Sequence, residues 1–244
     1  MDKRFLSNQE VVKASRDFIC ARLLTYESAD EAKLLASFFT GRSGELENTT
    51  FTILAPDGKT PLVRPGRSPD MTFKDAAEMT ASMTKIAAKY PEKEEGARKL
   101  PYLVDLRRAI NTASCDIQPL VVVVGKQREK IESVLAPLAW SKEFIGTFAY
   151  VAVGNTDELA VIDGAEKKDG VLVVQPDTYG MKAKVLASDA GTDPEALAKA
   201  LKAGAAKFVP ETKDSKKHID AGVKKGVNWK TEIPETDPGP GKKP

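Results

Sequence analysis

The sequence predicts an α/β protein built from two units, and three observations support this. An internal repeat is the first: residues 51–67 read FTILAPDGKTPLVRPGR and residues 171–188 read VLVVQPDTYGMKAKVLAS. In each, five residues lead to a Pro-Asp pair and a helical pattern follows. Secondly, apolar runs alternate with helical stripes, which is typical of a sheet covered by helices. Thirdly, 244 residues with 41% apolar and 30% charged side chains suffice for two small globular units.

The first unit is expected over residues 1–91. Ser7 and Glu10 form a predicted capping box at the start of a helix. The continuous apolar run FICARLLTY at 18–26 predicts a buried strand. Next come a helix over 28–41, a hairpin over 48–66 and a helix over 73–90 that ends before Pro91.

The second unit is expected over residues 100–208, after a charged linker at 91–99. The patterns predict, in order, a helix over 102–113, a strand over 119–125, a helix over 128–145 that Pro137 kinks, a strand over 147–154, a short helix over 157–162, a hairpin over 170–188 and a helix over 193–208 that Asp193 caps. Residues 209–244 predict an extended or disordered tail, which Val223, Val227, Trp229 and Ile233 could anchor.

Two quoted phrases carry a resemblance to a known family. SNQEVVKASRDFICARLLTYE, from Ser7, and ENTTFTILAPDGKTPLVRPGR, ending at Arg67, resemble segments of the thioredoxin-like superfamily. The resemblance implies two tandem thioredoxin-like units, each a mixed sheet flanked by helices, the first lacking its N-terminal strand. It also implies where catalytic groups belong.

The family's catalytic motif is missing at the matching position. A Cys-x-x-Cys at the start of a helix lowers a thiol pKa there, but Gly125-Lys126-Gln127-Arg128 stands at this point in the second unit. The cis-proline that precedes the hairpin in the family is absent as well. The resemblance therefore implies a redox-inactive binding or assembly module. The alternative is a thiol-disulfide oxidoreductase whose dithiol lies upstream of Met1, or is replaced by Cys20 or Cys115.

The two cysteines are the candidate redox thiols. Cys20 lies within the predicted strand, where a buried thiol is inert. Cys115 lies at a helix-to-strand junction beside Asp116, which would raise its pKa. A disulfide between them requires that their segments lie adjacent.

Other chemistry is sparse. Two Gly-Arg-Ser turns are candidate anion sites, through Arg42, Ser43, Arg67 and Ser68, although ordinary turn chemistry also explains them. Met71, Met79 and Met83 could offer thioethers to Cu(I), but Ile86 continues the stripe of the last two, which favours a core role. His218 is the single histidine, so no Ser-His-Asp or Cys-His arrangement has a base to spare unless the tail folds back. We expect no metal site and no cofactor.

Charge and hydropathy constrain partners and compartment. The net charge of +2 gives no overall attraction to polyanions. The tail's lysines alternate with acidic residues, and only Trp229 offers stacking there, so we expect no nucleic-acid partner. No apolar run approaches a membrane span, and we expect a soluble chain without a membrane partner. A periplasmic or secreted location stays open if an export signal has been removed. The expected partner is a protein, or a second copy, bound through an exposed sheet edge or the tail.

Overall fold

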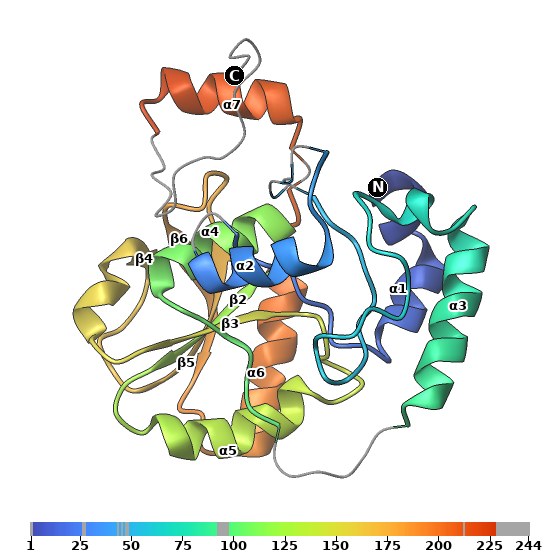
Figure 1. Ribbon diagram of the computed structural model, residues 1–244. Helices are drawn as coiled ribbons and strands as arrows, with labels where there is room; N and C mark the ends of the chain where they lie inside the picture. The colour runs from blue at the N-terminus through green and yellow to red at the C-terminus, as the bar shows by residue number, and fades with distance from the viewer. Residues whose placement is uncertain are drawn as a thin grey trace. The chain divides into compact units, whose positions relative to one another are not determined.

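The computed structural model describes residues 2–25, 28–42, 44, 46, 49–91, 98–211 and 213–227 (Figure 1). Contacts divide the chain into two compact units, one that includes Met1–Lys93 and one over Glu94–Asn228. The secondary structure combines helices with a six-stranded mixed sheet. The predicted α/β class is therefore confirmed.

The first unit is mainly helical in its described part. Its elements are η1 (Asp2–Leu6), α1 (Gln9–Ser15), α2 (Ala29–Phe38), η2 (Pro69–Met71) and α3 (Ala76–Lys89). The cap of α1 is Asn8 rather than Ser7, because its Oδ1 accepts from the Glu10 N–H at 3.0 Å. Ser28 and Asp75 cap α2 and α3 in the same way.

The strand predicted over 18–26 is wrong. Residues 18–25 are irregular, and Cys20 is exposed rather than buried within a strand. A strand covered on both faces needs neighbours along its edges, and the described residues of this unit contain no strand that could pair with it. The mixed sheet expected in the first unit is likewise not found in its described part.

The hairpin predicted over 48–66 forms a loose antiparallel ribbon in its described residues. Isolated bridges join Phe51 to Gly66 and Leu54 to Pro61. With α1 and α3 this ribbon encloses a small core formed by Phe5, Val11, Ile53, Phe73, Met79 and Met83. Because Met79 and Met83 are buried there, their thioethers fill the core.

The second unit is built around the sheet. Its strands are β1 (Tyr102–Leu103), β2 (Leu120–Val124), β3 (Ala149–Val153), β4 (Ile162–Asp163), β5 (Gly170–Pro176) and β6 (Ala183–Asp189). The strand order is β1-β3-β2-β5-β6-β4. β1, β2 and β3 run parallel, β5 is antiparallel to both β2 and β6, and β4 is parallel to β6.

Helices cover both faces of this sheet. One core lies under α5 (Arg128–Ala139) and α6 (Pro194–Lys207), and the other under α4 (Leu106–Asp116) and η3 (Thr156–Val161). All five residues of β2 are buried, because that strand lies between two partners and two layers.

Three expectations for this part of the chain differ from the structure by more than one or two residues. The helix expected over 102–113 is β1 followed by α4, which Asp105 caps. α5 ends at Ala139, before the predicted 145, and Pro137 lies within its last turn. Because proline has no N–H to donate, the helical ladder weakens there.

The third difference lies in the tail, where α7 (Ser215–Lys224) forms after α6. Figure 1 shows α7 beyond the turn between β5 and β6. The expectation of an extended or disordered tail is thus wrong for these ten residues. Val223 is 71% exposed and does not anchor the tail. Trp229 and Ile233 lie outside the described residues.

Candidate functional site

The end of β2 is the place where the resemblance to the thioredoxin-like superfamily would put a catalytic thiol. Gly125 has φ +101°, and a Cβ built there would lie 1.9 Å from Asp169 Oδ1. Any side chain at 125 would therefore have both a strained backbone and a clash with a carboxylate. Gln127 precedes α5 without a side-chain cap. The place that starts a reactive helix in an oxidoreductase thus holds a glycine and an acidic side chain.

Arg128 occupies the first position of α5. Its guanidinium lies 4.5 Å from the centre of the Tyr102 ring and forms an ion pair with Glu132. Burial raises the pKa of Tyr102, and the nearby Glu132 carboxylate adds to this effect. In the register of β1 and β3, Tyr150 stands beside Tyr102, and burial raises its pKa too. Neither tyrosine hydroxyl is available as a base at ordinary pH.

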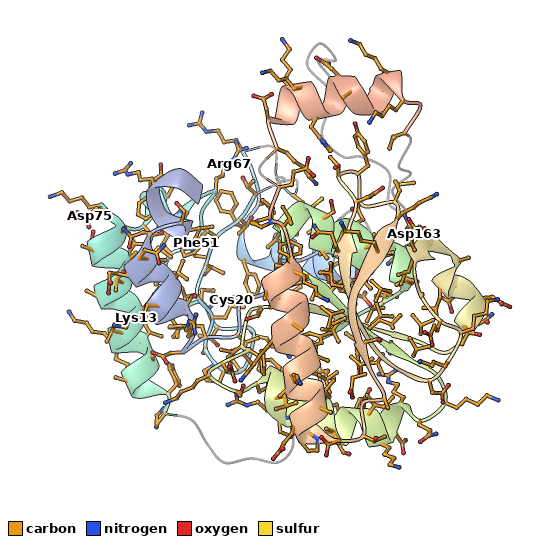
Figure 2. The ribbon with its side chains drawn as sticks, turned by 180° about the vertical axis from the view of Figure 1, so that it is seen from behind. Lys13, Cys20, Phe51, Arg67, Asp75 and Asp163 are labelled. Atoms are coloured by element: carbon orange, nitrogen blue, oxygen red, sulfur yellow. The ribbon has the colours of Figure 1, made fainter. Side chains whose placement is uncertain are left out.

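The candidate thiols lie in different units. Figure 2 labels Cys20 in the irregular segment after α1. Its Sγ lies 3.8 Å from the Ser15 carbonyl oxygen, and burial of the sulfur raises the pKa of the thiol although the residue as a whole is exposed. Cys115 is exposed on the last turn of α4. A raised pKa makes Cys20 a poorer nucleophile at neutral pH.

Of the two Gly-Arg-Ser turns, the structure describes the first only in part. Arg42 is exposed, whereas Ser43 lies outside the described residues. At the second turn, which contains Ser68, the Arg67 N–H donates to Met71 Sδ at 3.2 Å. A thioether therefore occupies one of the backbone donors that an anion would need.

A third region emerges only in the structure. After α6 the chain folds back onto the β5–β6 turn and α4. Gln175 exchanges two hydrogen bonds with the backbone of Val209, at 2.9 and 3.1 Å. Thr178 Oγ1 donates to Glu211 at 2.7 Å. We call the described residues of this segment, 209–211 and 213, the return strap.

Lys213 ends the strap at the C-terminus of α4. Its Nζ donates to Ser114 Oγ at 2.7 Å and to the Ser114 carbonyl at 3.2 Å. A cation is favourable there, because helix C-termini carry unpaired carbonyls and negative dipole charge. Ser114 Oγ donates in turn to the Asp177 carbonyl at 2.9 Å. Because Lys213 is the donor and the hydroxyl proton is already engaged, this pair is not poised as nucleophile and base.

Ser114 and Lys213 also line a small, shallow hollow. Its apolar lining includes Ile117, Pro176 and Phe208. Ile117 has φ 55°, and it is the one non-glycine residue with positive φ in the described ranges. A β-branched residue in this region is strained, so the end of α4 is held there by its surroundings.

Tyr179 at the tip of the β5–β6 turn holds α7. The His218 ring stacks on Tyr179 with centroids 4.8 Å apart and an interplanar angle of 21°. Lys225 Nζ lies 5.2 Å from the same ring centroid, and a Cβ on Gly222 would lie 3.2 Å from that ring. One face of α7 is thereby fixed. Ile219 is 61% exposed on the same helix, next to the still more exposed Val223.

The sheet edge, the other expected binding surface, is partly protected. β4 covers only the start of β6. Farther along, Ala187 pairs with Val173 and Val185 with Val174, so Leu186 is an extra, bulged residue. Lys207 Nζ donates to its carbonyl at 3.0 Å. A bulge and a lysine both discourage another strand from pairing here.

Sequence reasoning missed the strap and α7, although one signal was present. Asp214 begins a run in which Ile219 and Val223 are four residues apart, and Asp214 indeed caps α7. The role of Tyr179 had no sequence signal beyond its place in a turn.

Comparisons with known proteins add no further identification: no family model matches the chain, nor does any curated protein or solved structure. Within the described part of the chain no cluster of three metal-ligating side chains occurs. No helix there has both the length and the apolar character needed to cross a membrane.

Proposed function

We propose that the second unit is a thioredoxin-like domain that acts as a non-catalytic binding or assembly module. Its element order supports this reading: β1, α4, β2, α5 and β3 make parallel crossovers, and η3 leads to a β5–β6 hairpin and a closing helix. The strand order, with β2 central and β5 antiparallel to it, also fits that fold. For the first unit, the same proposal is supported only by the resemblance of the hairpin phrase.

One observation carries the non-catalytic reading. At the end of β2, Asp169 lies against Gly125 where a side chain would collide with it. An attacking thiolate needs a helix N-terminus free of nearby negative charge, since that charge would raise the thiol pKa. The site therefore lacks both the sulfur and the electrostatic setting for disulfide exchange.

Thiol chemistry tests this proposal directly. We expect the purified chain to reduce insulin disulfides no faster than its Cys20→Ser/Cys115→Ser variant. Alkylation of Cys20 should become faster only at alkaline pH, because the pKa of its thiol is raised. A rate of insulin reduction that depends on either cysteine would refute the non-catalytic assignment and favour the oxidoreductase alternative.

A further inference from the structure

The exposed side of α7 combines apolar and basic side chains. Ile219 and Val223 are four residues apart and therefore lie on one side of the helix. Three exposed lysines, Lys216, Lys217 and Lys224, lie on the part of the helix that does not contact Tyr179, whereas Lys225 packs over that ring. Within Ser215–Lys224 and the following lysine the single acidic residue is Asp220. An apolar pair surrounded by positive charge is suited to a partner surface of opposite charge.

A surface of that character lies on the same unit. We call residues 156–168, which comprise η3, β4 and the loop after them, the acidic edge. Lys167 pairs with Asp157 at 2.6 Å and Lys168 with Glu166 at 2.5 Å, so these four charges are balanced locally.

The acidic edge also contains two exposed carboxylates outside these pairs, one of which, Asp163, stands opposite Lys184 in the register of β4 and β6. Glu158 and Asp163 are exposed and form no ion pair within the described ranges. Val161, between them, is 37% exposed. Figure 2 shows Asp163 at the border of the sheet, toward the end of the unit where α7 lies. The acidic edge therefore offers negative charge and an apolar side chain, which complement the lysines and the apolar pair of α7.

We propose that two copies of this chain associate through these surfaces, with α7 of each copy on the acidic edge of the other. A twofold axis would form both contacts at once, since such an interface uses the same patch on both partners. This inference rests on the proposed binding function and names the partner as a second copy. It also assigns a role to the fixation of α7 by Tyr179, which holds the helix so that its basic and apolar side stays outside.

The size of the surfaces sets the expected strength. A helix of ten residues is about 15 Å long, and with a short loop it covers less than the roughly 800 Å² per partner of a standard interface. The dimer should therefore be weak, dependent on concentration and sensitive to salt. At about 0.5 M salt the Debye length falls to a few ångströms, which removes most of the charge attraction.

Sedimentation velocity and light scattering on the full chain test the proposal, from about 1 μM to about 1 mM protein. We expect a shift from monomer to dimer at low salt, with association at least about tenfold weaker at about 0.5 M salt. The variant Lys216→Glu/Lys224→Glu and the variant Glu158→Lys/Asp163→Lys should each remain monomeric. An equimolar mixture of these two variants should dimerise, because both contacts then join opposite charges.

The controls separate interface loss from misfolding. Lys85→Glu/Lys89→Glu makes the same charge change at exposed positions of α3 and should dimerise like the unmodified chain. Ile219→Ser/Val223→Ser should abolish the dimer at every salt concentration. Circular dichroism and thermal unfolding should match among all variants.

Three outcomes would overturn the inference: a monomer throughout the range, a dimer indifferent to the charge reversals, or no rescue in the mixture. None of them bears on insulin reduction, which tests the proposed function separately.

Discussion

At the scale of single residues, the turn of the first hairpin rests on Asp57. Its carboxylate accepts from the N–H groups of Lys59 and Thr60 at 2.8 and 2.9 Å and from the Thr60 hydroxyl at 2.6 Å. The Thr60 hydrogen bonds contribute most to lowering the pKa of Asp57, from 3.8 to about 2. Such side-chain bonding is the usual role of aspartate in turns.

Acidification should therefore loosen this turn. The pKa is lower in the folded state than in the unfolded state, so the carboxylate stabilises the fold fully above about pH 4 and the contribution is lost as pH falls toward 2. NMR titration should show the Thr60 and Lys59 amide signals moving with a midpoint near pH 2. In Asp57→Asn the same signals should not titrate in this range. A midpoint near 3.8 in the unmodified chain would show that these hydrogen bonds do not form in solution.

At the scale of secondary-structure elements, α6 approaches the sheet closely at one glycine. A Cβ on Gly204 would lie 2.4 Å from Val173 Cγ1 and 2.6 Å from Val173 Cβ. Gly204 is buried inside a helix, where glycine costs about 1 kcal/mol relative to alanine. Close packing of α6 on β5 is thus achieved at the expense of helix propensity.

Replacement of Gly204 by alanine has two opposite effects on the stability of the fold. Gly204→Ala gains up to about 1 kcal/mol of helix propensity, but overpacking a core typically costs about 1–3 kcal/mol. We expect net destabilisation, measured as a lower midpoint of urea unfolding. Ala206→Gly, at an exposed position of the same helix, reports propensity alone and should cost about 1 kcal/mol. A more stable Gly204→Ala variant would show that α6 does not pack this closely.

At the scale of the whole molecule, each unit has its own core. Both cores of the second unit are formed by residues within 100–201, on the two faces of a single sheet. The core of the first unit is formed by residues within 5–83. A hydrophobic core of its own is what allows a domain to fold alone.

The second unit should therefore fold when expressed by itself. A fragment of residues 94–228 should unfold in one cooperative transition, as single domains of this size usually do. Calorimetry and amide hydrogen exchange would check this, with protection expected in β2 and β5. A fragment without cooperative unfolding would show that the second unit requires the remainder of the chain.

Prediction from the sequence was most successful where local signals and burial agree. The run PLVVVVG predicted β2 because a continuous apolar segment of this length suits a strand covered on both faces. Asp193 and Pro194 predicted the start of α6 through capping chemistry. The same reasoning was wrong for FICARLLTY, because an apolar run becomes a strand only when another strand pairs with it.

Of the candidate site, the sequence predicted only that no cysteine stands at the start of α5. Its residues at 125–128 show that no cysteine stands there, but the contact of Asp169 with Gly125 joins positions 44 residues apart in the chain. The strap likewise depends on Ser114 and Lys213, whose separation of 99 residues gives no local pattern.

By itself the sequence determined the α/β class, most elements of the second unit, and the absence of a Cys-x-x-Cys motif, because propensity, capping and residue identity are local properties. Only the tertiary structure decided that the first unit has no sheet in its described residues, that α7 stacks on Tyr179, and which of its side chains face outward. These outcomes depend on contacts between distant segments, and such contacts form only when the packed arrangement lowers the free energy of the chain as a whole.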